Sequence, residues 1–394
     1  MSRTESDDVL HCRHFGTCGG CSLLDQPIRW QLHDKREAVE RLLAPHLGGL
    51  RVAHDEPRRT PRWFRTRLLY PVRADDDGLP IVGLYAFRSN DLVRIEECQT
   101  VDRWLVAFGR GAEQVLRELQ LVPFDARRNR GHVKAIWARL ASGSGEVMAG
   151  IVTRPGAFTA GRDFAERLAA MAAAIEHGKT PRRLVGIVHS VSDRDDDFLL
   201  GDRHTPLRGR DHVVDRRDGL AFRISAGSFY QIHAGAYDLL YRRALQLVGD
   251  VRGRTVVDGF GGIGCFGLRL AHAGAAQVTI VEENATACRD AEHNAQANGL
   301  AGVTVVAAAF AKARFPDQPD LMVVDPPRSG LGEAGAARVI AAGPRRLLHV
   351  ACEAEALARD LPRLLAAGFR VRAIHLCDLF PHTEHVELLT LLER

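Results

Sequence analysis

Residues 255–268 read T-V-V-D-G-F-G-G-I-G-C-F-G-L, an apolar run followed by a glycine-rich turn and a new apolar stretch. This pattern predicts a strand that leads through a tight turn into a helix, and Gly262, Gly264 and Gly267 satisfy the spacing G-x-G-x-x-G. Glycines there let the backbone turn sharply and approach a ligand closely. Glu282 ends the next apolar run, where its carboxylate can accept hydrogen bonds from ribose hydroxyls. Taken alone, the pattern fits a dinucleotide and S-adenosylmethionine equally well, and Glu282 argues against a turn without a ligand.

The sequence around this loop alternates between strand-like and helical stretches. The strand-like segments lie at 254–258, 277–282, 303–307, 320–325, 346–351 and 369–376, with a last added strand at 385–391. This alternation predicts a parallel, doubly wound sheet, so we expect a Rossmann-like α/β domain over residues 221–394.

The N-terminal part of the chain has a different pattern. Residues 101–220 contain short strand-like segments and an Ala-rich helix near 162–177, which predict a β-rich central module. Residues 1–100 contain a Cys- and Gly-rich segment, a helix from Ile28 that ends by Pro45, and strands with turns. We therefore expect three regions along the chain.

Three chemically reactive side chains follow apolar segments in the C-terminal half. Asp325 opens D-P-P-R after V-V, Cys352 follows L-L-H-V-A, and Glu387 ends H-V-E. The ligand crevice of an open α/β sheet lies outside the carboxyl ends of its strands, so we expect these side chains to face one pocket. A thiol and a carboxylate in one pocket suggest covalent catalysis with a partner base. Without the two carboxylates, Cys352 would be interpreted as a buried cysteine at a strand end.

Four of the eight cysteines lie in the N-terminal quarter of the chain, at positions 12, 18, 21 and 98. Thiolates suit zinc or an iron–sulfur cluster, and the spacing alone does not decide between them. The alternative is four unrelated buried cysteines. The Gly-rich surroundings of Cys12, Cys18 and Cys21 argue against that alternative, whereas Cys98 is assigned because it is the only other cysteine in this half.

Composition indicates an ordinary globular protein, with 46% hydrophobic and 26% charged residues and a net charge of +4. The N-terminal residues are polar and acidic, and no apolar run could span a bilayer, so we expect a cytoplasmic protein. Arginines beside aromatic residues suit RNA phosphates and bases, although a solvated face beside core aromatics explains them equally well. The arginines of interest are Arg58, Arg59, Arg62, Arg65 and Arg67 around Trp63 and Phe64, and Arg127, Arg128 and Arg130.

Together these motifs resemble the S-adenosylmethionine-dependent RNA uridine C5-methyltransferases, and the resemblance covers almost the whole chain. It implies a class I methyltransferase sheet preceded by an iron–sulfur region and the β-rich module. It also implies a [4Fe-4S] cluster, whose ligands would be Cys12, Cys18, Cys21 and Cys98. S-adenosylmethionine would be bound by Gln231 of F-Y-Q, Phe260, Gly262, Gly264, Glu282 and Asp325. Cys352 matches the nucleophile and Glu387 matches the base.

The implied reaction methylates C5 of a uridine in RNA through a covalent bond between Cys352 and C6, because C5 of uracil alone is a poor nucleophile. The expected partner is RNA, with 23S ribosomal RNA favoured over tRNA, and neither DNA, a membrane nor an obligatory protein partner is expected. Many family members carry an N-terminal RNA-binding barrel, and the early position of Cys12 predicts none here.

The chain departs from the family pattern at three places. Gly261 stands where the family usually has Cys, Cys265 where an Asn is frequent, and A-C-E-A replaces S-C-N-P around the nucleophile. The negative charge of Glu353 beside Cys352 should raise the pKa of the thiol. This change motivates an alternative, an RNA-binding assembly factor that retains the fold. A nucleotide-linked oxidoreductase leaves D-P-P-R and Glu387 unexplained, and an amino-group methyltransferase is disfavoured because Arg328 follows D-P-P.

Overall fold

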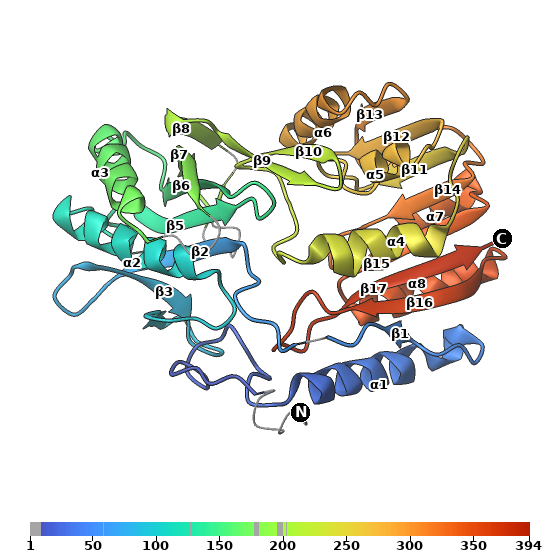
Figure 1. The fold of residues 1–394 in the computed structure, drawn as a ribbon, viewed down its shortest axis with the longest axis horizontal. Helices are drawn as coiled ribbons and strands as arrows, with labels where there is room; N and C mark the ends of the chain where they lie inside the picture. Colours follow the sequence, from blue (N-terminus) through green and yellow to red (C-terminus); the bar gives the residue numbers. More distant parts are fainter. Residues whose placement is uncertain (1–8, 58, 126–127, 177–180, 195–199, 202) are drawn as a thin grey trace.

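The chain forms two large sheets within the residues that the computed structural model describes, which are 9–57, 59–125, 128–176, 181–194, 200–201 and 203–394. In this part of the chain the C-terminal sheet has eight strands and the central sheet has seven. A two-stranded ribbon of β9 (His212–Arg217) and β10 (Leu220–Ser225) lies between them (Figure 1).

The C-terminal sheet has the strand order β1-β16-β17-β15-β14-β11-β12-β13. Neighbours from β13 to β15 pair in parallel, whereas β17 is antiparallel to both β15 and β16. The strands are β11 (Thr255–Gly259), β12 (Gln277–Glu282), β13 (Val303–Ala307), β14 (Leu321–Val324), β15 (Arg346–Ala351), β16 (Arg370–Cys377) and β17 (Glu387–Glu393). The predicted Rossmann-like α/β fold is therefore confirmed, with each predicted strand displaced by at most a few residues.

Helices connect the strands of this sheet and cover its faces. They are α4 (Arg242–Val248), α5 (Gly267–His272), α6 (Ala285–Ala297), α7 (Gly332–Ala342) and α8 (Ala354–Ala366), with a π-helical turn η2 (Tyr237–Tyr241) before α4 and a short turn η3 (Phe310–Lys312) after β13. Because both faces are covered, strands such as β14 are buried at every position, as expected of a parallel sheet.

The central sheet has the order β4-β3-β2-β5-β6-β7-β8. Its strands are β2 (Arg67–Ala74), β3 (Pro80–Tyr85), β4 (Leu92–Arg94), β5 (Val133–Leu140), β6 (Glu146–Thr153), β7 (Arg183–Val191) and β8 (Arg203–Gly209). Helices α2 (Arg103–Glu118) and α3 (Gly161–Ala173) pack together, and their fully buried Phe108 and Phe164 belong to the hydrophobic core of this sheet. The α3 crossover explains why β6 and β7 pair in parallel.

The N-terminal helix packs on the C-terminal sheet, an arrangement that the sequence did not predict. Helix α1 (Ile28–Leu47) contacts α8, and β1 (Ala53–His54) pairs in parallel with β16 (Figure 1). The prediction that this helix ends by Pro45 is wrong, because a proline in the last turn removes only one backbone donor. The helix ends instead at Leu47 and is capped by Gly48, whose left-handed φ of 57° favours glycine.

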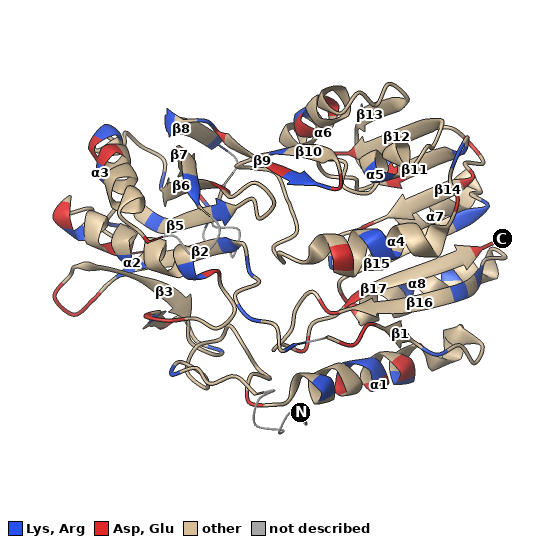
Figure 2. Cartoon of the chain, viewed as in Figure 1, with Lys and Arg blue, Asp and Glu red and all other residues tan. Residues whose placement is uncertain are grey.

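Positively and negatively charged residues are interspersed along α1 and at scattered places over the rest of the chain (Figure 2). This mixture agrees with the small net charge of +4. Within the described residues, no helix is long and apolar enough to span a membrane.

Candidate active site

Three strand ends bring Asp325, Cys352 and Glu387 to the same edge of the C-terminal sheet. Asp325 directly follows β14, and Cys352 directly follows the neighbouring β15. Glu387 begins β17, and because β17 runs antiparallel, its first residue lies at the edge where β15 ends. The register places Leu388 opposite Ala351 and Glu387 opposite Cys377. The sheet therefore gathers the three side chains that the sequence singled out.

Burial and mutual repulsion favour the uncharged forms of these three groups. Burial raises the pKa of the Cys352 thiol to about 11, with further contributions from Glu387 and Asp325. Burial likewise raises the pKa of Asp325 to about 7. Glu387 is only 2% exposed, and its burial next to Asp325 holds its pKa well above the usual range. Such perturbed groups in one place are typical of a catalytic site.

Two charged side chains act on the thiol in opposite directions. Arg328 of D-P-P-R lowers the pKa of Cys352, whereas Glu353 raises it, both more weakly than burial does. The Arg328 Nε and Glu353 Oε1 atoms are 3.7 Å apart, and Glu353 also lies 3.9 Å from His385 Nδ1. The effect predicted for Glu353 is thus present, and Arg328 partly opposes it.

The glycine-rich loop is held by the two carboxylates that flank it. The Gly267 N–H donates to Asp258 Oδ2 at 2.7 Å, and the Gly262 N–H donates to Glu282 Oε2 at 2.9 Å. Gly264 has a φ of +88°, and a Cβ there would lie 2.8 Å from the Leu268 side chain, so only glycine fits. The loop therefore depends on glycine both for its turn and for its close packing.

The absence of the family's usual Cys at position 261 has a steric explanation. A Cβ on Gly261 would lie 2.6 Å from Ile280 Cγ2 and 3.0 Å from Asp258 Oδ2. A larger residue would therefore require this part of the loop to shift. Cys265, at the other position that departs from the family, is partly buried in the same loop.

A cavity of about 270 Å³ lies beside this loop, over the ends of β12 and β13. Phe260 and Glu282 line it, as do residues from the segment after D-P-P that includes Gly330 and Leu331. Phe310 also lines the cavity, with its ring centroid 4.9 Å from that of Phe260. Phe310 was not among the predicted site residues, although its position just after a predicted strand was the available signal.

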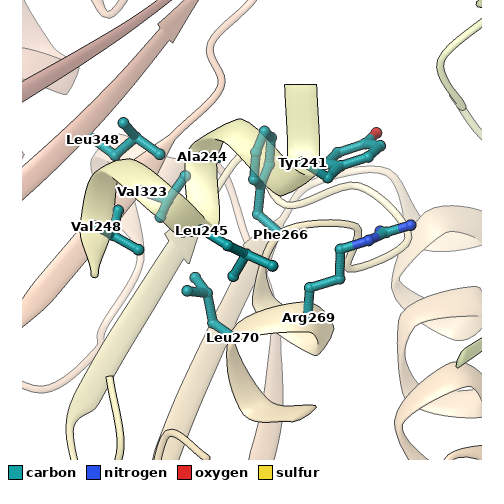
Figure 3. A pocket seen from close by; sticks show the side chains of 9 residues that line it. All are labelled: Tyr241, Ala244, Leu245, Val248, Phe266, Arg269, Leu270, Val323 and Leu348. Carbon is teal, nitrogen blue, oxygen red and sulfur yellow. The ribbon is translucent and has the colours of Figure 1, made fainter. Parts of the chain in front are cut away.

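A much smaller cavity of about 10 Å³ lies beneath α4 and is shown in Figure 3. Its lining is apolar except for Tyr241 and the guanidinium group of Arg269. This space would hold about one water molecule. It is therefore part of the core rather than a second ligand site.

The other predicted cofactor residues are not among those that line the cavity. The Gly262 N–H donates to Glu282, which does line the cavity. The Asp325 N–H donates to the Gly259 carbonyl at 3.2 Å. Gln231 is buried in the connection between β10 and η2. Cofactor binding by Gly262, Asp325 and Gln231 is therefore still a prediction.

The four N-terminal cysteines lie close enough together to influence one another electrostatically. Burial raises the pKa of Cys21 to about 12, and Cys98, Cys18 and Cys12 each contribute, whereas Arg65 lowers it. The Gly20 and Val101 N–H groups each lie 3.4 Å from a cysteine sulfur, those of Cys18 and Cys98 respectively. Among the described residues, no group of His, Cys, Asp and Glu side chains is arranged to hold a metal ion.

The arginines and aromatic residues that were considered for RNA binding differ in how far they are buried. Arg58 and Arg127 lie outside the described residues. Phe64 is a core residue stacked on His233 at 4.7 Å, and Arg65 donates to the Gly20 carbonyl beside the cysteines. The exposed members are Arg59, Arg62, Arg128 and Arg130.

The C-terminal domain is an open α/β sheet with a cavity over its strand ends. It also has a glycine loop after its first strand and a carboxylate at the end of the next strand. These features define a Rossmann-like enzyme that binds an adenosine-containing ligand. Comparisons with known proteins identify the family. A profile described as tRNA (Uracil-5-)-methyltransferase matches residues 317–394, and a methyltransferase small domain profile matches residues 238–349.

Full-length relatives extend the match to almost the whole chain. An uncharacterized RNA methyltransferase of Caldanaerobacter subterraneus subsp. tengcongensis is 30% identical over 97% of this chain and 84% of its own length. Another, from Halalkalibacterium halodurans, is 31% identical over 97% of this chain and 82% of its own length. The crystal structure of Pyrococcus abyssi tRNA (uracil-54, C5)-methyltransferase with S-adenosyl-L-homocysteine is 25% identical, with a TM-score of 0.75 over 95% of this chain and 84% of the other. The chain belongs to the family of S-adenosylmethionine-dependent RNA uracil-C5 methyltransferases.

Proposed function

We propose that the protein methylates C5 of a uridine in RNA through a covalent bond between Cys352 and C6 of the base. The observation that carries this proposal is the position of Cys352, Glu387 and Asp325 at one edge of the sheet, close enough for both carboxylates to raise the pKa of the thiol. A nucleophile and a partner base in one pocket are what this chemistry requires.

The steps follow from the chemistry of uracil. The Cys352 sulfur forms a bond to C6, and the electron pair of the C5–C6 double bond becomes available at C5. S-adenosylmethionine, when bound, supplies an electrophilic methyl group on a sulfonium ion, and C5 takes that methyl. Glu387 then removes the C5 proton, the electrons of the C5–H bond restore the C5–C6 double bond, and the C6–S bond breaks to release the thiolate.

The raised pKa values of Cys352, Asp325 and Glu387 suit a site that binds a cation. Cys352, Asp325 and Glu387 would all be negative if ionised, and burial makes that state unfavourable in the free protein. A positive charge close to them lowers all three pKa values. Phe260 and Glu282 would hold the adenosine part of S-adenosylmethionine, because they line the cavity. Thiolate formation would therefore be coupled to cofactor binding.

We further propose that Cys12, Cys18, Cys21 and Cys98 hold a [4Fe-4S] cluster. Four thiolates could bind a single zinc ion, with each sulfur about 2.3 Å from the metal, or an iron–sulfur cluster. The sulfurs of a cluster are farther apart, because each binds a different iron. The guanidinium of Arg65, which lowers the pKa of Cys18 and Cys21, would also balance the negative charge of four thiolates. Because the methylation needs no electron transfer, the cluster would serve folding or RNA docking.

The favoured substrate is 23S ribosomal RNA in the cytoplasm, with tRNA as the second candidate. Exposed arginines that precede the methyltransferase domain, such as Arg59 and Arg128, would contact the RNA on either side of the target uridine. The target uridine must leave its stack to reach Cys352.

A methyl-transfer assay with labelled S-adenosylmethionine tests the function. Unmodified ribosomal RNA and tRNA are offered separately to the wild type and to Cys352→Ala. We expect label to appear as 5-methyluridine in one RNA pool, and only with the wild type. Label from Cys352→Ala would exclude the covalent mechanism, because that variant has no thiol to attack C6.

The thiol pKa of about 11 is the observation that favours a second candidate, an RNA-binding assembly factor without turnover. That function predicts binding of cofactor and RNA with no label transferred in either RNA pool.

A further inference from the structure

A buried hydrogen-bond network joins the cysteine segment to the loop that precedes Glu387. Its centre is His382, which is fully buried and has a φ of +67°. The His382 carbonyl accepts from the N–H groups of both Ser22 and Leu23, each at 3.0 Å. Ser22 directly follows Cys21, so these bonds connect a proposed cluster ligand to the loop of residues 378–386.

Gln31 of α1 reinforces the same connection. Its side chain is fully buried, and its Nε2 donates to the Leu23 carbonyl at 2.7 Å and the Gln26 carbonyl at 2.8 Å. Its Oε1 accepts from the His382 N–H at 2.9 Å, and its Nε2 lies 3.3 Å from His382 Nδ1. One amide thus contacts both the chain after Cys21 and the chain before Glu387.

Further hydrogen bonds hold the same loop. His382 Nε2 lies 2.9 Å from the Pro61 carbonyl, and Lys35 of α1 donates to Asp378 at 2.8 Å and to the Phe380 carbonyl at 3.0 Å. A residue with a side chain at positive φ is strained and persists only where its surroundings hold it there. The network therefore determines the path of the chain into Glu387.

We propose that Gln31 and His382 are positioning residues for Glu387, and that through them the fold of the cysteine segment sets the placement of the base. This inference rests on the proposed function, because it takes Glu387 as the group that removes the C5 proton. Loosening the network should affect that late step and leave the attack of Cys352 unchanged, since Cys352 is held by β15 and α8.

The experiment compares two RNA substrates with wild type and with Gln31→Met, which keeps the size of the side chain but loses its hydrogen bonds. With uridine RNA, the variant should accumulate a protein–RNA adduct on denaturing gels and turn over at least about tenfold more slowly. With 5-fluorouridine RNA no C5 proton can be removed, so the adduct should form within about twofold of the wild-type rate. Gln26→Met is the control, because Gln26 joins the network through its backbone carbonyl.

His382→Asn serves as the second variant in case Gln31→Met does not fold, because asparagine tolerates positive φ better than most residues. Normal turnover of uridine RNA by the folded variants, without adduct, would overturn the inference. Equal slowing of both substrates would also overturn it, because the defect would then precede the base. Failure of the wild type to form any adduct with 5-fluorouridine RNA would instead refute the covalent mechanism, and this inference with it.

The link to the cysteine segment has its own measurement. Backbone hydrogen exchange over residues 378–386 is compared between the wild type and Cys21→Ser, with β12 as the internal reference. We expect at least about tenfold faster exchange in that loop and no change in β12. Unchanged exchange over 378–386 would show that the cysteine segment does not hold the base.

Discussion

Cys352, the proposed nucleophile, has surroundings that favour the thiol over the reactive thiolate in the free protein. Burial is the largest cause of its raised pKa, followed by the carboxylates of Glu387 and Asp325. Only the thiolate attacks C6, so the free enzyme would be nearly inert at neutral pH. On the proposed mechanism, this environment would protect the thiol from side reactions until a cation binds in the site.

The pH dependence of Cys352 alkylation tests this environment. The pKa of about 11 lies above the assay range, so the thiolate fraction rises as the pH rises. The rate of alkylation of cofactor-free protein by iodoacetamide should increase about tenfold per pH unit from pH 7 to about 10, without a plateau. Mass spectrometry of the Cys352 peptide gives the rate, with Cys352→Ala as the blank. A plateau near pH 8.5, the value of an ordinary cysteine, would contradict the account.

At the scale of elements, helix α8 links the nucleophile to its neighbours. The helix begins two residues after Cys352, and its N-cap residue Glu353 has extended backbone angles but makes no side-chain cap hydrogen bond. The N-terminal N–H groups of the helix are thus without the side-chain oxygen that usually accepts from them. The same residue places a negative charge next to the thiol.

Glu353→Asn should therefore change two properties at once. Asparagine is a favoured N-cap, so the free energy of unfolding should rise by about 1 kcal/mol in urea denaturation. Removing the charge should also lower the pKa of Cys352, which moves the alkylation profile to lower pH. Loss of the pair with Arg328 should cost little, because that side chain is 71% exposed.

Glu355→Gln provides the matched control for this prediction. Glu355 lies exposed in the first turn of α8, so its replacement removes a charge without adding a cap. We expect no gain in stability and no shift of the thiol profile. A Glu353→Asn protein less stable than the wild type would show that the helix start is already satisfied in another way.

The elements of the C-terminal half could be predicted because their sequence signals are local. The apolar run L-M-V-V of β14 is followed by D-P-P, and F-G-G-I-G follows β11 directly. The edge position of Asp325 and Cys352 followed from the same signals and a general property of parallel sheets. Glu387 was expected near the carboxyl end of a strand and instead reaches this edge as the first residue of the antiparallel β17. The end of α1 was missed because the tolerance of Pro45 depends on its place in the last turn.

At the scale of the whole molecule, the two large sheets are joined by buried polar contacts. Arg139 of β5 donates to the carbonyls of Ser225 at 2.9 Å and Ser228 at 2.8 Å. Asp290 of α6 accepts from the hydroxyl groups of the same two serines, at 2.7 and 2.6 Å. The segment that leads to Gln231 is therefore held from the central sheet on one side and from the C-terminal sheet on the other.

Arg139→Met should weaken this junction. The substitution leaves two buried carbonyls without their charged donor, so the free energy of unfolding should fall by roughly 2–4 kcal/mol. The Michaelis constant for S-adenosylmethionine should rise, because the segment before Gln231 loses its anchor. Arg162→Met is the control, since Arg162 is 87% exposed and its ion pair with Glu166 should contribute little. Equal stability of the two variants would contradict the proposed role of Arg139.

The long-range arrangement could not be predicted from the sequence. Three contacts join residues that are more than three hundred positions apart in the sequence. They are the packing of α1 on α8, the pairing of β1 with β16, and the hydrogen bonds between Gln31 and His382. Periodicity and motifs report neighbours along the chain and leave such contacts open. The sequence gives no signal for the role of His382, because its left-handed conformation and its partners exist only in the folded chain.

Mass spectrometry of the Cys352 peptide from a stalled reaction tests the central claim most directly. Glu387→Gln is incubated with uridine RNA and S-adenosylmethionine, denatured, and digested with nuclease and protease. We predict that the peptide carries one uridine nucleotide with one added methyl group, attached through the Cys352 sulfur, because attack and methyl transfer precede the step that needs Glu387. A peptide without an attached nucleotide, together with free 5-methyluridine in the RNA, would contradict the roles of both residues.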